Sequence, residues 1–335
     1  MKRIIDNWVH IPGLHCGSVT LRDVMTYYGY AWSEAMCFGI GGGLGFYYSV
    51  RDDISPSHMI FTRGPAMETT FFSLIDKPTL WKHASGNVID TIKKYIDKNV
   101  PVIIQTDIYY LDYYNSNTHF PGHIVSVWGY DDESRTMFVA DNHLEGLQQV
   151  PFEDFKDGMA STDSSNPLDN NFIEVKLNSP VGPLTDIIAE AIRENARKML
   201  YGCTGGRGES GAHKIKLWSE DLANWKDVSD WKWCSRFGYQ VIKKRGVGGA
   251  GFRWIYRDFL KEAEDIVPSL RGLKLSEKMD FIGNTWSEIA LVLKDISEKD
   301  NPDSGLLSAA SKMAYELWEL ESEFYTAAME KIEAN

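Results

Sequence analysis

Apolar residues in the first half of the chain follow two different spacings. They recur at three- and four-residue steps over residues 16–28 and 87–99, which predicts two amphipathic helices. They form nearly continuous runs over residues 100–111, 123–132 and 135–142, which predicts strands. Because a short polar turn separates the last two runs, we expect them to form a hairpin, and the first half to combine helices with an antiparallel sheet.

The second half has a different pattern. Residues 157–171 are rich in turn-forming residues and predict a linker or long loop, and a single strand-like run follows at 172–177. Helical spacing then covers three stretches, at residues 184–200, at residues 252–266 and from Asp303 onward. We therefore predict an α+β fold with two domains, a mixed one over residues 1–157 and a mostly helical one over residues 172–335.

Composition narrows the functional classes. The chain has 335 residues, 43% of them hydrophobic, and a formal net charge of −12. This charge argues against nucleic acid as a partner, and no apolar run approaches the length of a bilayer span. The first residues lack the apolar core of a signal peptide, and the four cysteines form no CxxC pair, as expected for reduced thiols. We predict a cytoplasmic protein that binds neither membranes nor nucleic acid.

One cysteine lies where a helix is predicted to begin. The sequence HCGSVTLRDVMTYYG places Cys16 in the first turn, where free backbone N–H groups and the helix dipole stabilise a thiolate. Cys37, Cys203 and Cys234 have no comparable setting. A cysteine nucleophile also needs a base that removes its proton and a group that orients the base.

The predicted hairpin supplies candidates for both partners. His123 begins its first strand and Asp141 ends its second, and both lie equally far from Asp132 in the turn. We therefore expect them to face each other as cross-strand neighbours. The Asp141 carboxylate would then accept the Nδ1 proton of His123 and fix the tautomer that acts as a base.

Each of these residues alone has an ordinary structural explanation. Buried cysteines are commonly inert packing, histidines at strand ends are commonly structural, and an aspartate after a strand commonly forms a turn. The three together, in this chain order, favour a set of thiol, base and orienting carboxylate. No metal site is expected, because His119 and His123 have Pro121 between them and cannot share a helix face.

The order of these residues resembles that of papain-like cysteine enzymes, especially the compact bacterial branch that trims leader peptides. The segments HCGSVTLRDVMTYYG, GHIVSVWGYDD and VADN are similar to the cysteine, histidine and aspartate boxes of that branch. The resemblance implies a papain-like first domain, in which a central helix packs on an antiparallel sheet.

The chain resembles the butirosin biosynthesis protein H family more closely. The similar segments include GIGGGLGF and TDIYYLDYY in the first half and VIKKRGVGGAGFRWIYRDFLKEA in the second. That family is known for acyl transfer, in which an aminoacyl group leaves a carrier-protein thioester and is joined to an amine of an antibiotic precursor. The resemblance implies that Cys16 is the nucleophile, His123 the base and Asp141 the orienting group.

The same resemblance implies the partners. These are an acyl or peptidyl carrier protein and a small-molecule amine acceptor, in antibiotic, nonribosomal-peptide or other specialised-metabolite biosynthesis. The protein itself would need no cofactor, since the donor carries phosphopantetheine on its carrier protein.

Two positions depart from the patterns of these relatives. Papain-like enzymes have a glutamine six residues before the cysteine that helps to hold the oxyanion, and here His10 occupies that position. Either His10 donates instead, or the backbone N–H of Cys16 and another donor do so. Where the family has Leu-Pro-Tyr, this chain has Leu111-Asp112-Tyr113, which would alter the mouth of the acyl pocket. The candidate residues of the substrate cleft are Gly41, Gly42, Gly43, Phe46, Tyr110 and Tyr113.

A glycine-rich segment with basic neighbours precedes the helix predicted at 252–266. The segment GVGGAG at 246–251 has the spacing of a dinucleotide loop, but no βαβ unit surrounds it. It could instead bind phosphopantetheine or the acidic face of a carrier protein, or form a solvated turn. The candidate carrier contacts are Lys244, Arg245 and Arg253.

Two other functions stay open on the sequence alone. The same three residues could serve an amidase or peptidase that uses water as the acceptor, or the chain could be an inactive binding module. The helical domain could close over the cleft, form a homodimer or buttress the first domain.

Overall fold

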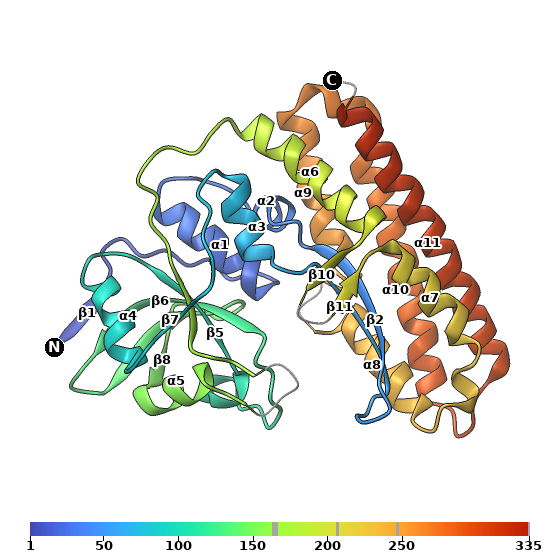
Figure 1. Ribbon diagram of the computed structural model, residues 1–335, viewed down its shortest axis with the longest axis horizontal. Coiled ribbons are helices and arrows are strands. Elements are labelled where there is room, and N and C mark those ends of the chain that lie inside the picture. Colours follow the sequence, from blue (N-terminus) through green and yellow to red (C-terminus); the bar gives the residue numbers. More distant parts are fainter. Residues whose placement is uncertain (163–166, 206–207, 246–247, 334–335) are drawn as a thin grey trace. The chain divides into compact units, whose positions relative to one another are not determined.

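The computed structural model describes residues 1–162, 167–205, 208–245 and 248–333 (Figure 1). The chain divides into two compact units, each made of two segments. Unit 1 comprises Met1–Cys37 and Ile75–Val181, and unit 2 comprises Phe38–Leu74 and Gly182–Asn335.

These units differ from the uninterrupted domains predicted at residues 1–157 and 172–335. Residues 38–74 pack with the helical unit, and the first unit extends beyond the predicted linker to Val181. Apolar spacing reports which residues are buried within one element, but not which distant segment covers them. The observed combination of an antiparallel sheet in unit 1 with a mostly helical unit 2 confirms the predicted α+β class.

Unit 1 is built on a sheet that has seven strands within the described residues. The order is β4-β9-β5-β6-β7-β8, and β1 also pairs with β6. The strands are β1 (Lys2–Ile4), β4 (Lys82–His83), β5 (Val102–Thr106), β6 (His123–Asp131), β7 (Thr136–Ala140), β8 (Leu147–Pro151) and β9 (Asn171–Glu174). All of their pairings are antiparallel. The predicted hairpin is therefore present as β6–β7.

The helices of unit 1 form close to where the apolar spacing predicts them. They are α1 (Cys16–Tyr27), α2 (Glu34–Ile40, which runs into unit 2), α4 (Val88–Ile96) and α5 (Phe152–Met159). The Asn87 side chain caps α4 by accepting the Ile89 N–H at 3.0 Å. Figure 1 shows α1 on one side of the sheet and α5 on the other.

The apolar run at 100–111 is only partly a strand. It forms β5 as far as Thr106 and then turns into two short 3₁₀ segments, η1 (Ile108–Tyr110) and η2 (Asp112–Tyr114). Asp107 breaks the strand, because its side chain accepts the Tyr109 N–H at 3.1 Å and so caps η1.

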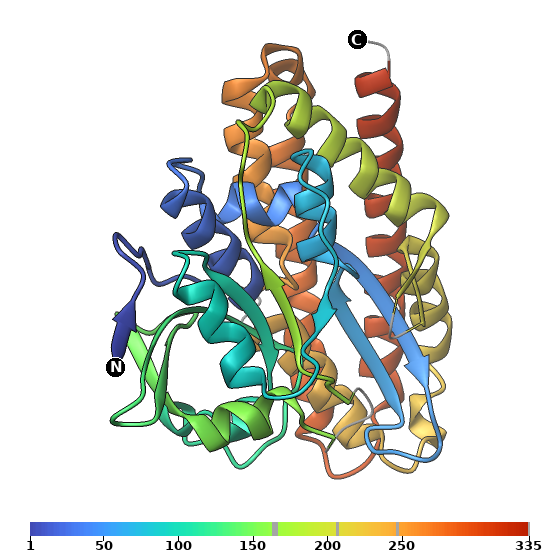
Figure 2. The same ribbon diagram turned by 60° about the vertical axis from the view of Figure 1, so that its left-hand side comes forward.

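Unit 2 contains long helices and short hairpins. Its helices are α3 (Met67–Leu74), α6 (Leu184–Tyr201), α7 (Ala212–Leu222), α8 (Trp231–Lys243), α9 (Arg253–Ile266), α10 (Leu275–Ser297) and α11 (Ser304–Glu333), with 3₁₀ segments η3 (Trp225–Asp227) and η4 (Pro268–Leu273). Its strands are β2 (Leu44–Val50), β3 (His58–Arg63), β10 (Cys203–Gly205) and β11 (Gly208–Ser210). Figure 2 shows the β2–β3 hairpin running beside the helices of this unit.

Aromatic packing joins the β2–β3 hairpin to the helices of unit 2. The buried ring of Phe46 lies 5.6 Å from Trp218 of α7 and 5.4 Å from Trp286 of α10, centroid to centroid. The two indole rings stack with an interplanar angle of 2°. These contacts explain why residues 38–74 belong to the helical unit. Among the described residues, none of the helices combines the length and the apolar surface that a bilayer crossing requires.

Candidate active site

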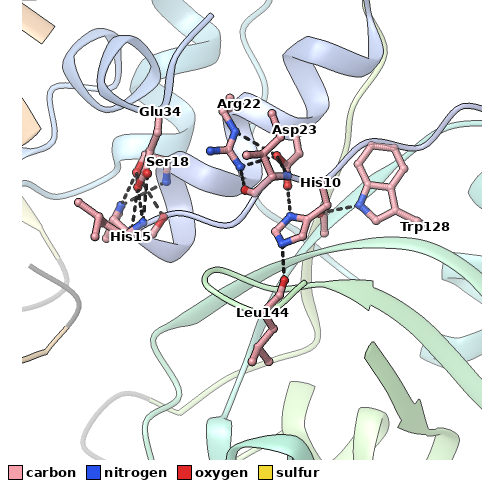
Figure 3. A network of polar contacts seen from close by, with 11 residues as sticks. His10, His15, Ser18, Arg22, Asp23, Glu34, Trp128 and Leu144 are labelled. Carbon is pink, nitrogen blue, oxygen red and sulfur yellow. Dashed lines mark hydrogen bonds and ion pairs between the residues drawn. The ribbon is translucent and has the colours of Figure 1, made fainter. Parts of the chain in front are cut away.

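Cys16 is the first residue of α1, and the preceding segment is fixed by hydrogen bonds (Figure 3). Nδ1 of His15 accepts the Ser18 N–H at 3.2 Å and so caps the helix. The Glu34 carboxylate of α2 accepts the N–H of Leu14 at 3.0 Å and of His15 at 2.8 Å. The backbone N–H of Cys16 has no hydrogen-bond partner among the described residues, as is common for the first donors of a helix.

His123 and Asp141 form a buried pair. Nε2 of His123 lies 2.8 and 2.9 Å from the two carboxylate oxygens of Asp141, and the side chains are 6% and 0% exposed. The prediction that Asp141 binds Nδ1 is therefore wrong, because the ring presents Nε2 to the carboxylate. The Cys16 side chain lies close enough to the same imidazole to raise its pKa, and Nδ1 is the ring nitrogen that Asp141 does not occupy. The structure thus brings His123 and Asp141 into contact and places Cys16 near them.

A β-bulge places His123 and Asp141 on one face of the hairpin. Val127 pairs with Val139, but Gly129 pairs with Phe138, so Trp128 is the extra residue. The register puts Asp141 two residues along from the position opposite His123, rather than directly opposite as predicted. Side chains two residues apart still share a face. Without the bulge, Asp141 would lie an odd number of residues from the position opposite His123, and the two side chains would point to opposite faces.

The surroundings of His123 favour its protonated form. Burial by itself lowers the pKa of this imidazole, but the charge and hydrogen bond of Asp141, together with the contact to Cys16, outweigh burial and raise the pKa to about 10. An imidazolium at neutral pH can stabilise a negative charge on the neighbouring sulfur.

Two tyrosine hydroxyls also bind Asp141. Tyr113 donates to Oδ2 at 2.7 Å, and Tyr114 donates to Oδ1 at 3.2 Å and lies 3.4 Å from Nε2 of His123. Burial, reinforced by the charge of Asp141, raises the pKa of both hydroxyls. They therefore stay protonated and donate to the buried carboxylate, which compensates for its loss of water.

The loop that carries these tyrosines is closed at its base by Asp107. Its carboxylate accepts the N–H of Tyr109 and, at 2.7 Å, the N–H of Phe120, and it also contacts Nδ1 of His119 at 2.8 Å and Oγ of Ser161 at 2.7 Å. Burial raises the pKa of Asp107, but these hydrogen bonds outweigh it and the net shift is downward. The ionised carboxylate of Asp107 thus binds both ends of the loop, at Tyr109 and at Phe120, and holds the tyrosines between them in place.

The oxyanion role predicted for His10 is not supported by its contacts. Nδ1 of His10 lies 2.5 Å from Oδ2 of Asp23 in α1, and Nε2 lies 2.8 Å from the carbonyl oxygen of Leu144 (Figure 3). Both ring nitrogens are occupied by protein groups, and the side chain is fully buried. Neither nitrogen is left to donate to a substrate oxygen.

The predicted cleft residues separate into two groups. Gly41, Gly42, Gly43 and Phe46 belong to unit 2 and are buried there, and Phe46 is part of the aromatic core described above. The assignment of Phe46 to an open cleft is wrong, because its ring is fully buried and packs against Trp218 and Trp286.

The other two predicted cleft residues lie in unit 1. Tyr110 is half-buried in η1, with its ring 5.2 Å from that of Tyr109. Tyr113 is also half-buried, and its hydroxyl is the one that binds Asp141. A role of Tyr110 and Tyr113 at a substrate cleft stays a prediction.

The three predicted carrier contacts also differ from one another. Lys244 and Arg245 are exposed, whereas Arg253 is fully buried and donates to both oxygens of Glu321, at 2.8 and 3.0 Å. A buried guanidinium with a paired carboxylate cannot meet a partner protein, so the prediction for Arg253 is wrong. Two residues of the GVGGAG segment, 246 and 247, lie outside the described residues.

Sequence reasoning missed the residues that support the pair. Each of Glu34, Asp23 and Asp107 binds a group at least 13 residues away along the chain, and no local spacing identifies those partners. The signal available for Tyr113 and Tyr114 was their position in an aromatic segment, which indicated a cleft but not a hydrogen bond to Asp141. Within the described part of the chain, no group of three or more His, Cys, Asp or Glu side chains could hold a metal ion.

Comparison with protein families gives two matches along the chain. Residues 15–142 match the model described as butirosin biosynthesis protein H, N-terminal, and this range contains all three residues of the site. Residues 153–328, more than half of the chain, match the domain of unknown function DUF4872. The chain belongs to the butirosin biosynthesis protein H-like family. Its second part is a DUF4872 domain.

Other comparisons add less. None of the curated proteins compared with this chain is significantly similar to it. Among solved structures, a C39-like peptidase from Bacillus anthracis is 15% identical, with a TM-score of 0.37, over 53% of this chain and 100% of its own. Similarity at that level supports no inference about activity.

Proposed function

We propose that the protein is a papain-like cysteine acyltransferase that forms an amide bond. It takes an acyl group from a carrier-protein thioester onto Cys16 and transfers it to an amine. The observation that carries the proposal is the buried His123–Asp141 pair beside a helix-terminal thiol that acts on the same imidazole, in a member of the butirosin biosynthesis protein H-like family.

The first half of the reaction forms the acyl-enzyme. The Cys16 sulfur attacks the thioester carbonyl, and a new C–S bond to the enzyme forms as the bond to the phosphopantetheine sulfur breaks. His123 gives its proton to the departing thiolate. Because one thioester replaces another, the step needs little driving force, and the rate depends on how well Cys16 and His123 are held.

The second half transfers the acyl group. The amine nitrogen attacks the carbonyl of acyl-Cys16, His123 takes the proton that the nitrogen loses, and the Cys16 sulfur leaves. The product is an amide and the starting enzyme is regenerated. Asp141 keeps the His123 ring oriented and stabilises its positive charge in both halves.

The developing oxyanion requires donors near Cys16. The backbone N–H of Cys16, which has no partner within the described residues, is one such donor. It points from the positive end of α1, where negative charge is favoured. Because protein groups occupy both nitrogens of His10, we assign the binding of the oxyanion to the backbone N–H of Cys16 and not to His10.

The test is to incubate the protein with an acylated carrier protein and an added amine, and to measure amide, free acid and acyl-enzyme by mass spectrometry. Amide formation that depends on Cys16 supports the proposal. Free acid as the product, whatever the amine concentration, would indicate a hydrolase, and the absence of any turnover would indicate a binding module.

Two variants sharpen this experiment. Cys16→Ala abolishes turnover, and His123→Ala slows it by orders of magnitude, about 10²-fold or more. The matched control is Cys203→Ala, which removes another partly exposed thiol and leaves turnover unchanged. Equal losses in the Cys16 and Cys203 variants would overturn the assignment of the nucleophile.

A further inference from the structure

We infer that His10 is a positioning residue that sets the geometry between Cys16 and the His123–Asp141 pair. This inference rests on the proposed function and deepens it. The segment of residues 10–14 lies between α1, which begins with Cys16, and the turn that follows Asp141, and it is hydrogen-bonded to both (Figure 3).

The first support is the chemistry of the two groups that His10 contacts. The carboxylate of Asp23 and the carbonyl of Leu144 are both hydrogen-bond acceptors. Both bonds form only if the imidazole donates from each nitrogen. Arg22 also donates to Asp23, through Nε at 3.1 Å and a terminal nitrogen at 2.8 Å, both to Oδ1. Oδ2 is thus left for His10.

The second support is burial. The side chains of His10, Asp23 and Arg22 are 0%, 1% and 8% exposed. Water cannot replace a hydrogen bond that is lost at such a site, so removal of the imidazole leaves buried acceptors without a donor. The bridge from α1 to Leu144 therefore depends on this one side chain.

The third support is where Leu144 lies. Its backbone N–H donates to the carbonyl oxygen of Asp141 at 3.0 Å, which closes the turn that begins with the orienting carboxylate. Asn142 provides a second connection between the same two segments. The Gly13 N–H donates to the carbonyl of Asn142 at 2.9 Å, and the Asn142 side-chain amide can donate to the carbonyl oxygens of Gly13 and Leu14. His10 and Asn142 together hold this turn against the segment that leads into Cys16.

The test measures the reactivity of Cys16 directly. The full-length protein is treated with iodoacetamide at pH values from 6 to 9, and alkylation of each cysteine is followed by peptide mass spectrometry. Cys203 is the internal reference, since burial raises the pKa of its thiol and no imidazole of the described residues is among the groups that shift this pKa. In the wild type, Cys16 is alkylated much faster than Cys203 below pH 7.

His10→Ala lowers the rate of Cys16 alkylation at pH 6.5 by about tenfold or more and shifts its pH profile upward, because a small displacement of the pair weakens its hold on the sulfur. His10→Gln retains one buried donor and gives an intermediate rate, which keeps the test available if the alanine variant does not fold. Asp23→Asn lowers the rate as His10→Ala does, and the double variant is no slower than the slower single variant.

The matched control is Tyr28→Phe. It removes one part-buried hydrogen bond, from a hydroxyl to the carbonyl of Val175 at 2.7 Å, elsewhere in unit 1. It leaves Cys16 alkylation unchanged. An unchanged rate in His10→Ala, an equal fall in Tyr28→Phe, or additive losses in the double variant would overturn the inference about His10. A wild-type Cys16 no faster than Cys203 would instead overturn the proposed function itself.

Discussion

Nε2 of His123 lies within 2.9 Å of both carboxylate oxygens of Asp141, and the two side chains are buried beside the thiol of Cys16. This arrangement fixes which nitrogen of the ring is available to the sulfur. It also makes the charge state of the imidazole depend on the carboxylate, because burial without that charge would favour the neutral ring.

We therefore expect Asp141→Asn to lower the pKa of His123. The carboxylate is the largest influence that raises it, and burial, which lowers it, remains in the variant. The measurement is an NMR titration of the His123 ring protons, in which the wild type titrates near pH 10 and the variant well below. Tyr113→Phe keeps the carboxylate and serves as the control with a high value. A value near 10 in Asp141→Asn would contradict the assigned cause.

The two tyrosines on Asp141 make a prediction about stability. Tyr113→Phe removes the shorter hydrogen bond to the buried carboxylate, 2.7 Å against 3.2 Å for Tyr114. We expect it to lower the free energy of unfolding by about 1–3 kcal/mol, and Tyr114→Phe to lower it less. Urea unfolding of both variants, with the wild type, measures the difference. The reverse order would mean that the Tyr114 contacts matter more than their lengths suggest.

The raised pKa of His123 also predicts how stability depends on pH. The folded state holds the proton up to about pH 10, whereas an unfolded histidine releases it near pH 6.5. The contribution of His123 to stability is therefore complete below pH 6.5 and falls as the pH rises towards 10.

This dependence is measured as the difference in unfolding free energy between the wild type and His123→Gln at pH 6, 8 and 10. The difference should shrink over that range, since only the wild type loses the proton-linked term. A constant difference would show that the imidazole is not held in its protonated form by the fold.

The exposed basic residues of unit 2 give a prediction about the carrier protein. Lys244→Glu and Arg245→Glu should raise the KM for a carrier-bound donor several-fold and leave the KM for a small thioester mimic unchanged, because charges at the edge of an interface act on the partner rather than on chemistry. Arg245 also stacks on Phe237 at 4.6 Å and donates to Gln240, so Lys244 gives the cleaner result.

The control for this experiment is Lys278→Glu, which changes the same charge at another exposed lysine of unit 2. An equal rise in KM for both donors, or an equal effect of the control, would show that general charge is responsible rather than a contact at Lys244.

The spacing of apolar residues predicted those parts of the site that depend only on neighbouring residues in the chain. The start of α1 at Cys16 follows from apolar spacing, and the hairpin of His123 and Asp141 follows from two apolar runs around a polar turn. The detailed pairing did not follow, because the bulge at Trp128 shifts the register. Nothing in the sequence around Trp128 shows which residue of a strand will be extra.

Residues whose partners lie far along the chain were the hardest to interpret. Its charge and its glycine-rich surroundings predict a surface position for Arg253, but Glu321 pairs with it in the core. The distance from Cys16 along the chain predicts an oxyanion role for His10, yet Asp23 and Leu144 occupy both nitrogens of its ring. In both cases the sequence shows the charge or the position of the residue, but it does not show which distant residue lies next to it in the fold.

The central claim is that Cys16 carries the acyl group, and a single-turnover experiment tests it most directly. The protein is mixed with one equivalent of acylated carrier protein without amine, and its intact mass and peptide map are recorded. The account predicts an added acyl mass on the peptide that contains Cys16, no such mass in Cys16→Ala, and discharge of the adduct when an amine is added. Normal acylation of Cys16→Ala, or an acyl group on any other residue of the wild type, would contradict it.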